Sequence, residues 1–161
     1  MNRILEHILP KVQKPARYTG GEYNAVVKDR QSVTTRFALC FPDTYEIGMS
    51  NLGCRILYGV MDREKNIWCE RCFAPWGDME EEMRREGLLL YGLESGDPIA
   101  DFDIIGFSLG YEMAYSNVLN MLDLAGLPLR SEDRPDLTPL VVAGGTCCYN
   151  PEPLAPFVDL F

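Results

Sequence analysis

The sequence is short of several features on which common protein classes depend. Histidine occurs once, at His7, which excludes sites built from several imidazoles. No apolar run approaches the roughly 18 to 20 residues of a membrane-spanning helix. The first helix candidate, Asn2 to Leu9, lacks the length and the cleavage site of a signal peptide. We therefore expect a cytoplasmic protein without membrane contact.

Positive charge is also scarce. The chain has 15 lysines and arginines against 24 acidic residues, a net charge of −9. This balance disfavours direct binding of nucleic acid or of anionic membranes. The G-x-x-x-x-G-K-[ST] phosphate loop and the G-x-G-x-x-G dinucleotide fingerprint are both absent. Binding of a charged ligand would have to depend on local groups.

The six cysteines are irregularly spaced and do not resemble the disulfide framework of a secreted protein. Cys69 and Cys72 form a C-x-x-C pair, which in isolation suggests zinc or redox chemistry. This pair lies in a predicted strand, where positions i and i+3 point to opposite faces. No second pair of ligands lies at metal-site spacing. We expect reduced, structural thiols and no metal site.

The order of apolar segments predicts one α/β domain. Residues 1–33 form an N-terminal extension with a short amphipathic start, and residues 34–161 alternate apolar runs with helical stripes. We predict a doubly wound, Rossmann-like (flavodoxin-like) fold with a mostly parallel sheet of about five strands and an irregular N-terminal arm. The expected strands are residues 37–41, 67–73, 102–109 and 140–143, with minor ones at 88–93 and 156–161. The expected helices are residues 49–61, 78–86 and 113–124.

Three predicted strands end in turns that carry small or polar residues. In open parallel sheets, ligands bind beyond the carboxyl ends of the strands. The candidate ligand-binding residues are Asp43, Tyr45, Gly48, Ser108, Leu109, Gly144 and Gly145. With equal weight, Asp43 is an ordinary turn residue, Tyr45 part of an amphipathic wall and Gly48 a glycine at a helix start.

The spacing Asp43-x-Tyr45-x-x-Gly48 resembles the D-x-H-x-x-G loop of cobalamin-binding Rossmann-like domains. In that family the histidine ligates cobalt, the aspartate holds the histidine, and the glycine lets the corrin tail pass. The resemblance implies that Ser108 stands at the serine-bearing strand end and that Gly144 and Gly145 accommodate the nucleotide tail. Tyr45 replaces the ligand histidine, so cobalamin would be held without a protein nitrogen beneath cobalt.

Longer phrases resemble the amino-terminal region of radical S-adenosylmethionine (radical SAM) proteins that carry a cobalamin-binding-like domain ahead of the catalytic barrel. They are KPARYTGGEYN, FPDTYEIGMSNLG, WCERCFAPW, DFDIIGFSL, SNVLNMLDLAG and VVAGGTCCYNPEP. The resemblance implies a 4Fe-4S cluster on a C-x-x-x-C-x-x-C motif, and S-adenosylmethionine, both in the barrel. That motif is absent here. We expect a piece truncated before the barrel, with no catalytic residues of its own.

Three functions remain open. The chain is an accessory domain that binds a corrinoid, or a degenerate domain that recognises substrate or docks on the C-terminal radical SAM domain of the same polypeptide. A third alternative is a flavodoxin-like module for a small ligand. Residues 1–33 are interpreted as an extension that packs its aromatics on the domain edge; a lid or phosphate-contacting arm is the alternative.

Overall fold

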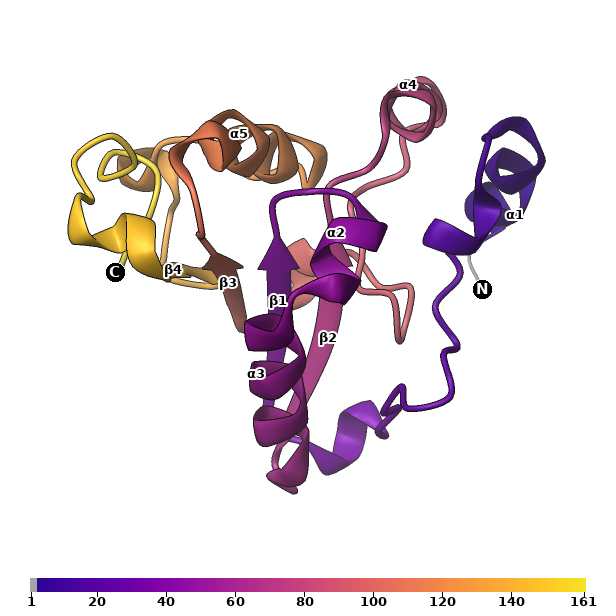
Figure 1. Cartoon of the computed structure of the whole chain (residues 1–161), viewed down its shortest axis with the longest axis horizontal. Coiled ribbons are helices and arrows are strands. Elements are labelled where there is room, and N and C mark those ends of the chain that lie inside the picture. Colours follow the sequence, from indigo (N-terminus) through magenta and orange to yellow (C-terminus); the bar gives the residue numbers. More distant parts are fainter. Residues whose placement is uncertain (1–2) are drawn as a thin grey trace.

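The protein is built on one sheet of four parallel strands in the order β2-β1-β3-β4, as seen in a computed structural model that describes residues 3–161 (Figure 1). The strands are β1 (Thr35–Phe41), β2 (Ile67–Phe73), β3 (Ile104–Ser108) and β4 (Leu140–Gly144). The helices are α1 (Arg3–Ile8), α2 (Tyr45–Ser50), α3 (Leu52–Arg63), α4 (Gly77–Glu86) and α5 (Tyr115–Leu124). The α/β, Rossmann-like class predicted from the sequence is confirmed.

The two minor strands expected from the sequence are single bridges. Leu160 pairs with Val142 in parallel, so the last residues follow the free edge of β4 without forming a strand. In residues 88–93, Tyr91 makes one antiparallel bridge to Pro98. The apolar residues of this segment are explained by burial, because Leu88 and Leu90 belong to the main core.

The helix expected over residues 49–61 is divided into α2 and α3. Asn51 breaks it with extended backbone, and its Oδ1 accepts the Cys54 N–H at 3.0 Å as an N-cap. The apolar stripe is real, but its residues face outward: Leu52, Ile56 and Val60 are each more than half exposed. The side of α3 that meets the sheet carries Cys54, Tyr58 and Met61.

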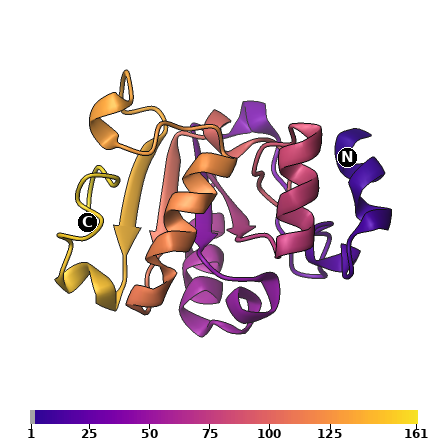
Figure 2. The ribbon, with the colours of Figure 1, turned by 90° about the horizontal axis from the view of Figure 1, so that it is seen from above.

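The two faces of the sheet are covered unequally. One face lies under α4 and α5, which are side by side in Figure 2, with α1 beyond α4. The large core is on this face and includes Phe107, Met121 and Leu122, all essentially inaccessible. On the other face α3 crosses β1 and β2 (Figure 1), over a small cluster centred on Leu39 and Cys69, and α2 packs through Gly48 against Phe73 of the same cluster.

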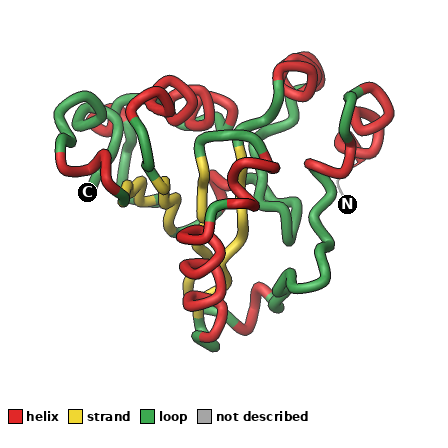
Figure 3. Tube along the Cα trace, viewed as in Figure 1, coloured by secondary structure: helices red, strands yellow, loops and turns green. Residues whose placement is uncertain are grey.

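The N-terminal region is irregular after α1. Residues 9–34 contain only short 3-10 turns and run as a long loop beside the sheet (Figure 3). Tyr18 is buried, and its hydroxyl accepts the Trp76 N–H at 3.2 Å. The expected helix start at Asn2 lies outside the described residues. No helix in residues 3–161 has both the length and the apolar character needed to cross a membrane.

Candidate functional site

The predicted turns lie together beyond the carboxyl ends of β1, β3 and β4. We call residues 43–48, 108–111 and 144–146 the rim. Asp43 Oδ2 accepts a hydrogen bond from the Tyr111 hydroxyl at 3.0 Å, which joins the first turn to the second. Leu109 N–H donates to the Gly144 carbonyl at 2.7 Å, which joins the second turn to the third. The structure thus brings the three sequence-distant turns side by side.

Some residues of the first turn point away from the other two turns of the rim. Tyr45 donates its hydroxyl to Glu22 Oε1 at 2.6 Å, and its ring stands edge-on to Phe73, 5.5 Å between centroids. Burial and the hydrogen bond to Glu22 raise the pKa of Tyr45 to about 12. A Cβ on Gly48 would lie 2.2 Å from the Phe73 ring, so the missing side chain makes room for that ring. Tyr45 and Gly48 therefore pack against Phe73 of β2 rather than facing the second and third turns.

The other rim residues divide between structural and open positions. Gly145 has φ +118°, and a Cβ there would lie 2.3 Å from the Leu109 carbonyl oxygen, so glycine is required. Gly144 is exposed, and nothing lies within 4 Å of the point that a Cβ on it would occupy. Ser108 lies beside Cys54; burial raises the pKa of the Cys54 thiol, and the Ser108 hydrogen bond opposes that rise.

These contacts do not fit a corrinoid held from below by residue 45. The phenol of Tyr45 keeps its proton at neutral pH and is already engaged by Glu22. The space beside Gly48 is taken by Phe73 rather than left for a ligand. Within residues 3–161, no group of three or more His, Cys, Asp or Glu side chains could hold a metal ion. Cys69 and Cys72 belong to the clusters on opposite faces of the sheet, as their spacing predicts.

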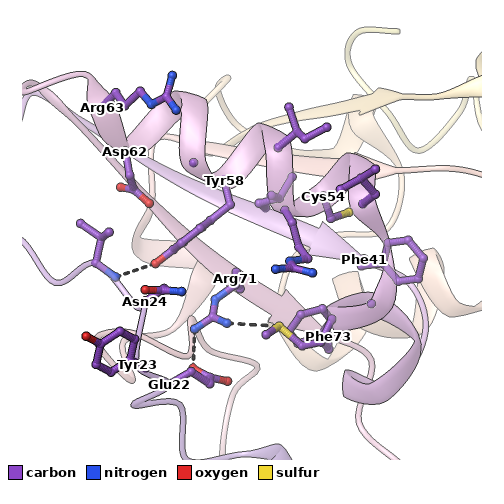
Figure 4. Close-up of a pocket in the computed structure, with 18 residues that line it drawn as sticks. Glu22, Tyr23, Asn24, Phe41, Cys54, Tyr58, Asp62, Arg63, Arg71 and Phe73 are labelled. Carbon is purple, nitrogen blue, oxygen red and sulfur yellow. Dashed lines mark hydrogen bonds and ion pairs between the residues drawn. The ribbon is translucent and has the colours of Figure 1, made fainter.

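A cavity of about 780 Å³ lies on the α3 face, away from most of the rim (Figure 4). Its walls are α3, the β1 and β2 strands, and residues 22–26 of the N-terminal region, which we call the strap. Of the seven predicted residues, Gly48 alone lines it. The volume is in the range of small-molecule sites.

The strap is tied down on both sides of the cavity. On one side, Glu22 Oε2 accepts from Arg71 Nη2 at 2.6 Å. On the other, the Val26 N–H donates to the Tyr58 hydroxyl at 2.7 Å, and Trp68 Nε1 donates to the Val26 carbonyl at 3.0 Å. Tyr23, between these ties, is fully exposed. The strap is therefore a fixed wall with one free aromatic side chain.

Arg71 is a buried charged residue that lines the cavity. Besides Glu22, it donates from Nε to Glu94 Oε1 at 2.6 Å, and its guanidinium lies 5.1 Å from the Tyr58 ring centroid. Burial alone would raise the pKa of Glu22, but the hydrogen bonds from Arg71 and Tyr45 bring it below the ordinary value. Burial raises the pKa of Glu94 despite the same arginine. Tyr45 thus orients the carboxylate that pairs with Arg71.

Sequence reasoning missed this cavity and its charges. The available signal was Glu70-Arg71 inside an otherwise apolar strand, because charges in a buried strand require partners. For Arg71, those partners are Glu22 and Glu94, which are distant in sequence and do not stand in a motif.

Comparison with protein families gives one match. The family model for the N-terminal region of radical SAM proteins matches residues 53–161. This chain belongs to the radical SAM N-terminal domain family. The matched region holds most of α3 and continues through β4, including Ser108, Gly144 and Gly145, whereas β1 and the Asp43 turn precede it. Comparisons with curated proteins and with solved structures gave no match.

Proposed function

We propose that this chain is an accessory domain that packs against the catalytic domain of a radical SAM protein, in the same polypeptide and in the cytoplasm. Membership of the radical SAM N-terminal family supports the accessory role. The 4Fe-4S cluster and S-adenosylmethionine would belong to the catalytic domain, which would supply the radical chemistry. Residues 3–161 offer no metal-ligating cluster for such a cofactor.

The single observation that carries the docking role is the uncovered half of the α3 face. Leu57 and Val60 are 46% and 52% exposed. On a helix they lie on the flank opposite the cavity-lining Arg55 and Gly59, and so toward β3. We call Leu57, Val60 and the half-buried Ile104 and Val142 of the neighbouring strands the open half.

The sheet register places the strand residues of the open half on the same face as α3. Leu39, which packs beneath α3, pairs with Gly106, and Gly106 pairs with Val142. Neighbours in a parallel sheet share a face. No helix in residues 3–161 covers β3 and β4 on this side, although parallel sheets are ordinarily covered on both faces. A catalytic domain in the same polypeptide is the occupant that the family membership favours.

The test is association of this chain with a separately produced catalytic domain of the same polypeptide. We expect a one-to-one complex in size-exclusion chromatography that is lost with Leu57→Asp together with Val60→Asp. Leu137→Asp is the matched control, because Leu137 is 66% exposed and outside the open half. Absence of a complex, or equal binding by the double variant and the control, would contradict the proposal.

A second candidate function is binding of cobalamin without a protein ligand to cobalt. The adjacency of the three rim turns and the open space at Gly144 favour it. We expect added cobalamin to raise the melting temperature and shift the visible spectrum of the wild-type chain, and to do neither with Gly144→Trp. An unchanged spectrum and melting temperature in the wild type would exclude this candidate.

A further inference from the structure

Three arginines line the cavity beneath the strap, and two of them, Arg55 and Arg63, have no ionic partner within the described part of the chain. Arg71 is neutralised by Glu22 and Glu94. Arg55 and Arg63 of α3 are exposed, and neither guanidinium has an ion pair or a hydrogen bond within residues 3–161. Arg63 lies at the end of the cavity that also holds the Asp62 carboxylate (Figure 4), which would repel an anion, whereas Arg55 has no acidic neighbour in the helix sequence beside it. In a protein with a net charge of −9, an unpaired guanidinium at a cavity is the group that would recognise an anion.

Much of the rest of the lining is apolar. Leu39, Phe41 and Phe73 form the wall from the sheet, and Leu52 and Ile56 form the wall from α3. These helix residues are more than half exposed, so a ligand would remove them from water. Gly59 leaves a notch in the same wall, because nothing lies within 4 Å of the position its Cβ would take.

The strap supplies the opposite wall and polar groups of its own. In Figure 4, Tyr23 and Asn24 stand across the cavity from Tyr58 and Asp62 of α3. The Asn24 amide can both donate and accept. The Tyr23 ring is free to stack, since its side chain is fully exposed.

We propose that this cavity binds a small organic anion with a planar aromatic body, with Arg55 holding the anionic group and the strap covering the ring. The class includes mononucleotides, whether adenine- or flavin-based. The site differs from the rim and from the open half, which lies on the other flank of α3. Loss of the docking activity and loss of this ligand are therefore separable.

The test compares phosphorylated and unphosphorylated probes on the 161-residue chain by titration calorimetry: AMP against adenosine, and FMN against riboflavin. Trp68 gives a second readout, because its indole donates to the strap at Val26. Trp76→Phe removes the other, half-exposed tryptophan and leaves Trp68 as the sole tryptophan. We expect AMP or FMN to bind more tightly than its unphosphorylated counterpart, adenosine or riboflavin, and to change the fluorescence emission of Trp68.

Variants assign the anion to Arg55. Arg55→Glu should weaken phosphate binding about tenfold or more, as expected for loss of a charged hydrogen bond, and Arg55→Lys should retain part of it. Lys65→Glu is the matched control, because Lys65 is exposed, outside the cavity and changes the net charge equally. The inference is overturned if none of the four probes binds, if phosphate and nucleoside bind equally, or if Arg55→Glu binds as the control does.

Discussion

The two faces of the sheet differ in how completely the chain covers them. Under α4 and α5 the core is continuous, and side chains such as Phe107 and Leu122 are inaccessible. On the α3 face, one helix turns its apolar stripe outward, a cavity opens on one flank, and on the other flank no helix of residues 3–161 covers β3 and β4. The first face contains most of the buried apolar core that stabilises the fold. The second face leaves apolar side chains exposed to solvent.

Each face also buries an arginine, and the two arginines have different partners. Arg36, on the α4 and α5 face, pairs with Glu70 Oε1 at 2.5 Å and lies 4.0 Å from the Phe102 ring centroid. Arg71, on the α3 face, depends partly on Glu22 of the strap, whose side chain is 26% exposed. The first pair is sealed in the core, whereas the second joins the sheet to a loop.

The largest expected difference between the faces concerns these arginines. Glu70 is completely buried, so Glu70→Gln should destabilise the protein by about 3 kcal/mol, because it leaves a buried guanidinium undercompensated. Glu22→Gln should cost only about 1 kcal/mol, since its partly exposed charge is screened by water. Urea denaturation of both variants measures the two costs. Equal losses would show that the strap is as essential as the core.

A matched pair of leucines tests packing directly. Leu122→Ala in α5 should cost about 2 to 5 kcal/mol, the range for a fully buried leucine. Leu57→Ala in α3 should change stability by less than about 0.5 kcal/mol, because the side chain is nearly half exposed in the isolated chain. The same denaturation experiment compares them. A large loss at Leu57 would mean that the α3 face is already closed.

Two glycines on the α3 face differ in whether a side chain would meet other atoms: Gly48 lies against the sheet and Gly59 faces open space. Gly48→Ala should destabilise by about 1 to 3 kcal/mol, because the new methyl meets the Phe73 ring. Gly59→Ala should stabilise by up to about 1 kcal/mol, since it improves helix propensity and meets open space. Melting temperatures should therefore move in opposite directions. A shift of the same sign in both would refute this assignment of inside and outside.

The smallest expected effect is a dependence on pH specific to the strap. The pKa of Glu22 is lower in the folded protein than the ordinary glutamate value of 4.5. Its contribution to stability is therefore complete above that value and is lost as the pH falls through the lowered folded value. Stability curves of wild type and Glu22→Gln should converge as the pH falls into this window. Parallel curves would mean that Glu22 does not titrate with folding.

Much of the fold was predictable because it depends on local patterns. Short apolar runs and helical stripes identified the four strands and the α/β class, and strand-end turns placed Asp43, Ser108 and Gly144 on one rim. The role of Tyr45 was not predictable. Its partner Glu22 lies 23 residues earlier, in a loop with no motif.

The sequence alone determined the four main strands and the approximate positions of α3, α4 and α5, because the periodicity of apolar residues is a local property. It also determined family membership, because the family model is matched by the residue pattern of 53–161. Only the tertiary structure decided which way the stripe of α3 faces, since an apolar stripe turns inward only where something covers it. The same holds for the cavity, whose walls come from residues 22 to 73 and meet only when the chain is folded.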